Sequence, residues 1–127
     1  QLLEASNEEL TERIVRGIHR EVMDSLEPGL RARAGEVTIV IADRPPRSEA
    51  GPDGEDDLLG LYEGISLPER HIDDMEAVAD RITLFRVPLL DACDSESELR
   101  EEIRITIIHE LGHYFGFGED ELIRRGL

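Results

Sequence analysis

The sequence predicts a single α+β domain in which one long helix precedes three short strands and another follows them. At 127 residues the chain has the length of one ordinary domain. Two stretches, 6–26 and 95–117, repeat apolar residues at the spacing of a helix face. Three short apolar runs between them have the length of strands. We therefore expect one domain over residues 1–127, with an N-terminal and a C-terminal helix packed on a small sheet.

Composition limits the classes of partner. Thirty acidic residues against 14 basic ones give a formal net charge of −16. Nucleic acids and anionic membrane surfaces need clustered Lys and Arg, so neither is expected as a partner. The longest apolar run, 37–42, is far below the ~20 residues of a spanning helix. The single cysteine, Cys93, forms no internal disulfide. With no signal or transmembrane segment visible, a cytoplasmic location is the expectation.

The first helix is predicted over residues 6–26. Ser6 with Glu9 three positions later fits a capping box, so we expect the helix to begin at Ser6. The turn residues at 27–29 should end it. Its apolar face recurs at four-residue steps, at Leu10, Ile14, Ile18, Val22 and Leu26.

The three strands are short and separated by turn residues. Residues 37–42 form a continuous β-branched run, which favours a buried strand. Residues 44–57 are rich in Pro, Gly and acid, and predict an exposed loop. A second strand is expected at 58–62, where Gly60 marks a bulge or a close approach. A third is expected at 82–85, stopped by Pro88.

The last helix carries the polar residues of interest. Ser95 and Glu98 again fit a capping box. From residue 105 to 117 the helix has almost no charge, which predicts a path through the centre of the fold. Its remaining polar side chains should then be buried and in need of partners. These are His109, Glu110 and His113.

His109-Glu110-x-x-His113 is an HExxH motif on a helix. Residues four apart lie roughly 40° apart around the axis, so both imidazoles can share one metal ion. Glu110 projects to one side, near enough to reach a water on that metal. Zn²⁺ is the expected ion, because imidazole and carboxylate suit it and no thiolate cluster is present. The alternative interpretation is a pair of core histidines with a paired Glu, in an acidic interaction domain.

A catalytic zinc usually has three protein ligands. Gly116 can end the helix in the left-handed conformation and Gly118 gives a second pivot, so the chain can double back. Glu119, six residues after His113, has the offset for this return and is the favoured third ligand. Asp120 is the runner-up, and Glu121 and His71 are more distant candidates. Residues 119–121 could instead be the acidic first turn of a short terminal helix.

The motif running from His109 through Gly116 to Glu119 resembles the metzincin-like form of the zincin metallopeptidase motif. Segments 59–64, 81–86 and 109–122 together resemble the small bacterial zincin-like metallopeptidases called minimal zincins. The resemblance implies a compact fold with a small mixed sheet, one active-site helix and zinc-dependent peptidase activity. Two features depart from the pattern. Glu119 replaces the usual His or Asp, and no Met-turn follows the motif, because Met23 and Met75 both precede it.

The resemblance and the residue chemistry imply one mechanism. His109, His113 and Glu119 would hold Zn²⁺ and a water, and Glu110 would act as general base in peptide-bond hydrolysis. A peptide or protein substrate would add as a strand along the edge formed by Leu59, Gly60 and Leu61. A tyrosine, Tyr62 or Tyr114, is a candidate for stabilising the oxyanion. The alternative function is a non-catalytic zinc-binding module with a structural or regulatory role.

Overall fold

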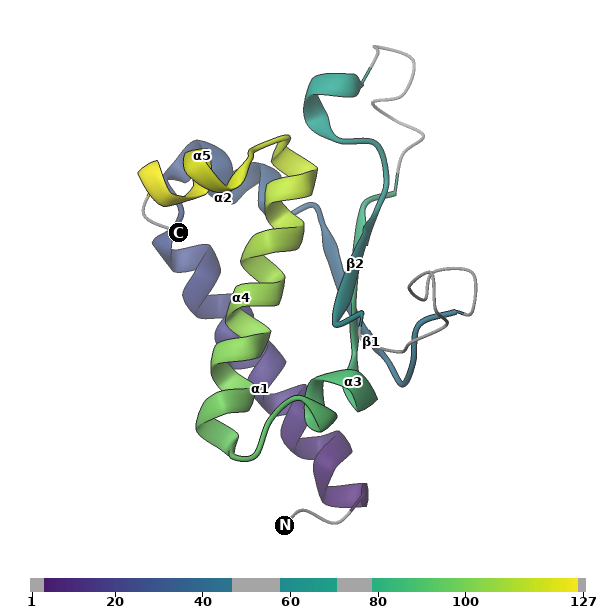
Figure 1. Cartoon of the computed structure of the whole chain (residues 1–127). Helices are drawn as coiled ribbons and strands as arrows, with labels where there is room; N and C mark the ends of the chain where they lie inside the picture. Colours follow the sequence, from purple (N-terminus) through teal and green to yellow (C-terminus); the bar gives the residue numbers. More distant parts are fainter. Residues whose placement is uncertain (1–3, 47–57, 71–78, 126–127) are drawn as a thin grey trace.

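The computed structural model describes residues 4–46, 58–70 and 79–125. The helices form one layer and the sheet the other, which confirms the expected α+β class (Figure 1). In chain order the elements are α1 (Glu4–Ser25), α2 (Pro28–Ala34), β1 (Thr38–Ala42), β2 (Gly60–Glu63), the 3-10 helix η2 (Leu67–Glu69), β3 (Arg81–Phe85), α3 (Arg86–Asp91), α4 (Glu96–Phe115) and α5 (Glu119–Arg124). Of these helices, none combines the length and apolarity needed to traverse a bilayer.

The sheet has the strand order β1-β3-β2 and is mixed, as the resemblance implies. β1 pairs with β3 in parallel, and β2 pairs with β3 in antiparallel orientation, with Tyr62 opposite Ile82. The central strand β3 is buried along most of its length. β1 is only half-buried, so the prediction of a buried strand at 37–42 is wrong. The reason is topological, because β1 is an edge strand and the helix layer covers only one face of the sheet.

The core lies between the helix layer and the sheet. α1 and α4 pack against one another, and α4 also contacts β2 and β3. The predicted apolar faces of both helices are confirmed, since their inward residues are nearly inaccessible to solvent. The largest fully buried side chains include Ile14, Ile18, Ile103, Ile107 and Leu111, with Ile82 and Leu84 from β3. Each such side chain stabilises the fold by about 1.5–3 kcal/mol relative to an exposed one.

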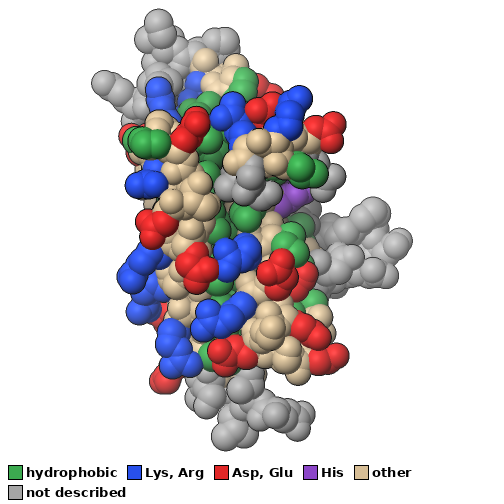
Figure 2. Space-filling model, turned by 90° about the vertical axis from the view of Figure 1, so that its left-hand side faces the viewer, with side chains coloured by type: hydrophobic (Ala, Val, Ile, Leu, Met, Phe, Trp, Pro, Cys, Tyr) green, Lys and Arg blue, Asp and Glu red, His purple; other side chains and the backbone are tan. Residues whose placement is uncertain are grey.

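The outer surface of the helix layer carries interspersed basic and acidic side chains (Figure 2). One ion pair, between Arg104 of α4 and Glu21 of α1 at 2.6 Å, joins the two long helices. Others join neighbouring turns of a single helix, as Arg16 and Glu12 do in α1. Among the described residues of this face, basic and acidic side chains are therefore intermixed and paired.

Local differences from the sequence prediction occur at element boundaries. α1 begins at Glu4, so Ser6 lies inside the helix and is not its N-cap. Pro28 follows the end of α1 but also starts α2, because a proline at the first helical position loses no intrahelical bond. β2 begins at Gly60, two residues later than expected. The predicted loop at 44–57 lies mostly outside the described residues.

Candidate metal centre

The start of α4 fixes the register of the helix that carries the motif. The backbone N–H of Glu98 donates to Ser95 Oγ at 3.1 Å, and Glu98 Oε1 accepts from the backbone N–H of Asp94 at 2.7 Å. These contacts confirm Ser95 as the N-cap, the feature that the sequence predicts. The HExxH residues consequently lie in the last two turns of α4, beside β2.

His109 and His113 lie side by side on the solvent-facing side of α4. Their ring centroids are 4.8 Å apart with an angle of 60° between the planes, as the four-residue spacing predicts. Both residues are exposed, and the His113 side chain retains 55% of its accessible area. The prediction that the histidines are buried is therefore wrong. Only one face of α4 packs against the core. Glu110 lies on that face, and the two imidazoles do not.

Glu110 is the buried member of the motif. Its side chain is 9% exposed, and its Oε1 accepts a 2.8 Å hydrogen bond from the backbone N–H of Tyr62 in β2. The same oxygen lies 3.4 Å from His113 Nδ1. Glu110 thus touches both the strand edge and the histidine pair. Ligand atoms of His109, Glu110 and His113 all lie within 4.8 Å of one another.

The strand beside this site approaches α4 very closely. A Cβ added at Gly60 would lie 2.5 Å from Thr106 Cγ2, so only glycine permits this contact. The predicted close approach at Gly60 is therefore present, and α4 is the element that approaches. β2 also pairs with β3, and Leu59 O, just before β2, accepts a hydrogen bond from Phe85 N–H at 2.9 Å. Of the strands in the described structure, β3 alone pairs with β2, which leaves β2 at the sheet edge as predicted.

Neither candidate tyrosine presents its hydroxyl to the histidines. The Tyr62 hydroxyl donates to Asp80 Oδ1 at 2.6 Å, and the Tyr114 hydroxyl donates to Arg33 O at 3.1 Å. Burial raises the pKa of both phenols, so they stay protonated as donors to these partners. Both hydroxyls are therefore bonded to other partners, and the suggested oxyanion role stays a prediction.

The chain reverses direction directly after the motif. Gly116 has φ 79°, and Phe117 N–H donates to Gly112 O at 2.8 Å, the bond that closes a Schellman-type helix end. This confirms the predicted end of the helix. α5 then returns against α4, since a Cβ at Gly112 would lie 3.0 Å from Leu122 Cδ1. The residue after Gly112 is His113, so the return brings α5 beside the motif.

The candidate third ligands lie on or near this returning segment. Glu119 is the first residue of α5, and its side chain lies outside the described part of the structure, as does His71. Asp120 is exposed and does not join the group of donors formed by the HExxH residues. Glu121 bonds to Arg124 at 2.7 Å and to Arg125 at 2.8 Å, and these guanidinium groups lower the pKa of its carboxyl.

The described donors suit a divalent metal ion such as Zn²⁺. Two adjacent exposed imidazoles can turn their nitrogens towards one ion without desolvating the rest of the helix. A carboxylate lies next to them, and the group contains no Cys. Imidazole and carboxylate donors together are a usual zinc environment.

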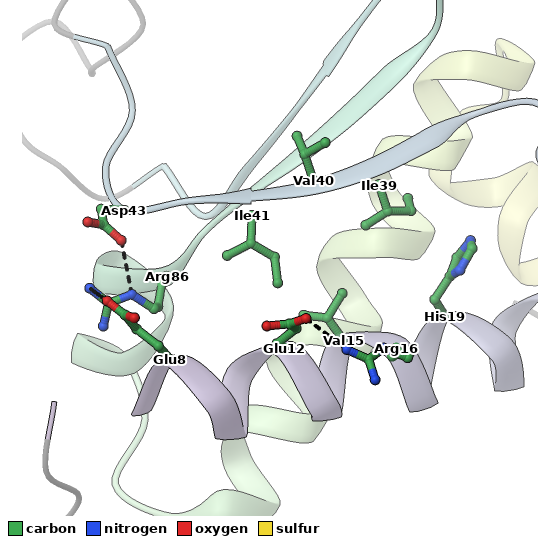
Figure 3. A pocket seen from close by; sticks show the side chains of 10 residues that line it. All are labelled: Glu8, Glu12, Val15, Arg16, His19, Ile39, Val40, Ile41, Asp43 and Arg86. Atoms are coloured by element: carbon green, nitrogen blue, oxygen red, sulfur yellow. Dashed lines mark hydrogen bonds and ion pairs between the residues drawn. The ribbon is translucent and has the colours of Figure 1, made fainter. Parts of the chain in front are cut away.

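A cavity of about 710 Å³ lies elsewhere, between α1 and β1 (Figure 3). Ile39 and Ile41 of β1 point towards α1 there, and His19 stands at one end. Its charged residues pair with one another, as Asp43 does with Arg86 at 3.0 Å. The cavity contains no cluster of metal-binding donors among the described residues, so the donors of the motif lie outside it.

Two residues near the motif were not predicted from the sequence. Arg70 and Asp80 form a buried ion pair behind Tyr62, with side chains 7% and 5% exposed. They lie ten positions apart, in segments that show no motif. Only the folded chain brings them together.

Comparison with known proteins identifies the family. Residues 34–127 match the family described as zincin-like metallopeptidase, a span that includes the whole sheet and the HExxH helix. No curated protein matches the chain. The match covers well over half of the sequence. The chain belongs to the zincin-like metallopeptidase family.

Proposed function

We propose that the protein is a zinc-dependent peptidase in which His109, His113 and Glu119 hold Zn²⁺ and Glu110 is the general base. The convergence of His109, Glu110 and His113 within 4.8 Å carries this proposal, and the family match supports it. The return of α5 against α4 supports Glu119 as the third ligand, because it begins with that residue. The nearby Glu121 is already engaged by two arginines.

When bound, the metal supplies Lewis acidity that lowers the pKa of a coordinated water and polarises a substrate carbonyl. Glu110 accepts the proton from the attacking water and delivers it to the leaving amine. Its geometry suits this task, since Oε1 is anchored to Tyr62 N–H and Oε2 makes no hydrogen bond to the described residues. One oxygen therefore fixes the carboxylate while the other can exchange a proton.

The proposed substrate is an extended peptide lying along β2. β2 is an edge strand beside the motif helix, and strand addition to such an edge supplies main-chain hydrogen bonds without sequence restriction. Leu59, Gly60 and Leu61 are the residues proposed to line this edge. The Gly60 contact with Thr106 places the strand directly against α4, so a peptide on the edge would pass close to Glu110.

A non-catalytic zinc module is the second candidate. One observation favours it, because Glu110 Oε1 already has a backbone partner and could serve only to join α4 to β2. The two candidates differ in turnover and agree in metal content, so a test must measure both.

The decisive variant is Glu110→Gln. The amide keeps an acceptor oxygen for Tyr62 N–H but cannot take a proton, so zinc content should stay at the wild-type level. Hydrolysis of a quenched-fluorescence peptide library should fall at least about 100-fold. Glu101→Gln is the matched control, because it makes the same change on the exposed face of α4, where Glu101 faces Arg104 at 3.9 Å.

Glu101→Gln should retain both zinc and activity. Equal hydrolysis by wild type and Glu110→Gln would contradict the general-base role. A zinc-loaded wild type that cleaves no member of the library would instead establish the non-catalytic module.

A further inference from the structure

A buried polar cluster stands directly behind the strand residue that holds Glu110. Asp80 accepts from the Tyr62 hydroxyl at 2.6 Å and forms the ion pair with Arg70. Arg70 Nε also donates to Ile65 O at 2.7 Å. The cluster therefore ties the end of β2 and the following turn to the residue that precedes β3.

The same cluster reaches α4. The rings of Tyr62 and Tyr114 meet edge to face with centroids 5.9 Å apart, and Arg70 Cζ lies 5.5 Å from the Tyr114 centroid. Tyr114 is one helical turn beyond Glu110. The strand and helix are thus joined by two contacts one turn apart: the ring pair, and the Tyr62 N–H bond to Glu110 Oε1 at 2.8 Å.

Stability alone is a weak reason for such a cluster. Replacing a buried ion pair by apolar residues of similar volume is often neutral or stabilising. What a network of directional bonds adds is a fixed geometry for the groups it holds. Here that group is Tyr62, whose backbone N–H is the hydrogen-bond partner of the proposed general base.

We propose that Asp80, together with Arg70, is a positioning device for Glu110 and acts through Tyr62. Asp80 fixes the Tyr62 side chain, the side chain fixes the backbone N–H, and the N–H fixes one oxygen of the Glu110 carboxylate. The catalytic importance of this chain of contacts rests on the proposed peptidase function. The positioning of the Tyr62 amide by Asp80 is independent of that function.

Hydrogen exchange at the amide of residue 62 tests the structural part in the zinc-loaded protein. Tyr62→Phe removes the bond to Asp80 and keeps the ring, so this amide should exchange about tenfold faster, the factor for one lost hydrogen bond. The amide of Leu84, in the central strand, should not change. Tyr114→Phe is the matched control. It also removes a tyrosine hydroxyl from the cluster, but that hydroxyl bonds to Arg33 O and not to Asp80.

A mutant cycle shows whether the effect passes through Glu110. Glu110→Ala removes the acceptor and should give the fastest exchange at residue 62. Adding Tyr62→Phe to Glu110→Ala should then cause no further increase, whereas independent effects would multiply. The double variant Arg70→Met with Asp80→Leu removes the ion pair without leaving a lone buried charge, and should match Tyr62→Phe.

Kinetics test the catalytic part. Tyr62→Phe should lower kcat about tenfold and leave KM within about twofold, because the hydroxyl points away from the strand edge. Unchanged exchange in Tyr62→Phe, or an equal increase in Tyr114→Phe, would overturn the positioning role even if wild type is an active peptidase. An inert wild type would remove the peptidase proposal, and the exchange data would still decide whether Asp80 holds residue 62.

Discussion

Two regions of the molecule place histidine beside an edge strand, and they differ in what surrounds it. Between α1 and β1, His19 lines a cavity of about 710 Å³ whose acidic and basic groups pair with one another. Between α4 and β2, His109 and His113 stand exposed beside Glu110, with three donors within 4.8 Å. Cavity volume is a common guide to function. The proposed function follows the three donors of α4 and not the cavity, because the extended peptide proposed as substrate would need a strand edge such as that of β2.

Removing a histidine from each region should have the largest and most unequal effect. His113→Ala should weaken zinc affinity by more than about 100-fold, since losing even a supporting group costs tenfold or more. His19→Ala should leave zinc affinity unchanged, because His19 lines the α1–β1 cavity, away from the motif. Competition with a chromogenic chelator measures both. Equal losses in the two variants would show that the metal is not held where the donors converge.

Replacing one glycine by alanine in each region should change the free energy of unfolding in opposite directions. Gly116→Ala should lower the free energy of unfolding by about 2 kcal/mol, because φ is 79° and the new Cβ would overlap the Pro68 ring. Gly17→Ala, in α1 near the other cavity, should raise it by about 1 kcal/mol, since a Cβ there meets nothing within 4 Å. Urea unfolding of both variants measures the difference. A stable Gly116→Ala protein would mean that α4 ends differently.

The segment after α4 should contribute a smaller share of the metal affinity. Glu119→Ala should weaken zinc binding about tenfold. Glu121→Ala should not, because that carboxylate bonds to Arg124 and Arg125. Isothermal titration of both variants with zinc provides the comparison. If Glu119→Ala binds zinc like wild type and Asp120→Ala does not, Asp120 takes the proposed role.

The parts of the fold that were predictable are those set by local sequence. Ser95 and Gly116 delimit α4 through contacts with residues only a few positions away, so the amino-acid pattern is enough to place the motif helix. The histidine pair follows from the four-residue spacing alone. The same local pattern predicted that α1 begins at Ser6, whereas the helix begins at Glu4.

The parts that failed depend on partners distant in sequence. The apolar run at 37–42 could not reveal that β1 would lie at a sheet edge and be only half-buried. The low charge around His109 and His113 suggested burial, yet only the Glu110 side of α4 meets β2. The Arg70–Asp80 pair, separated by ten positions and joined through the packing of β2, has no sequence signal.

The smallest expected effect concerns pH and the α1–β1 cavity. Burial lowers the pKa of His19 below 6.5, and its Nε2 is buried without a partner among the described residues. The folded state therefore favours neutral His19, and the unfolded state binds a proton more readily. Stability from this group is complete above pH 6.5 and declines as the pH falls through that value towards the folded pKa. Because His19 is partly exposed, the decline should stay below about 1 kcal/mol. Urea unfolding in chelator at pH 7.5, 6.5 and 5.5 should show wild type losing stability relative to His19→Gln, and parallel curves would contradict the assignment.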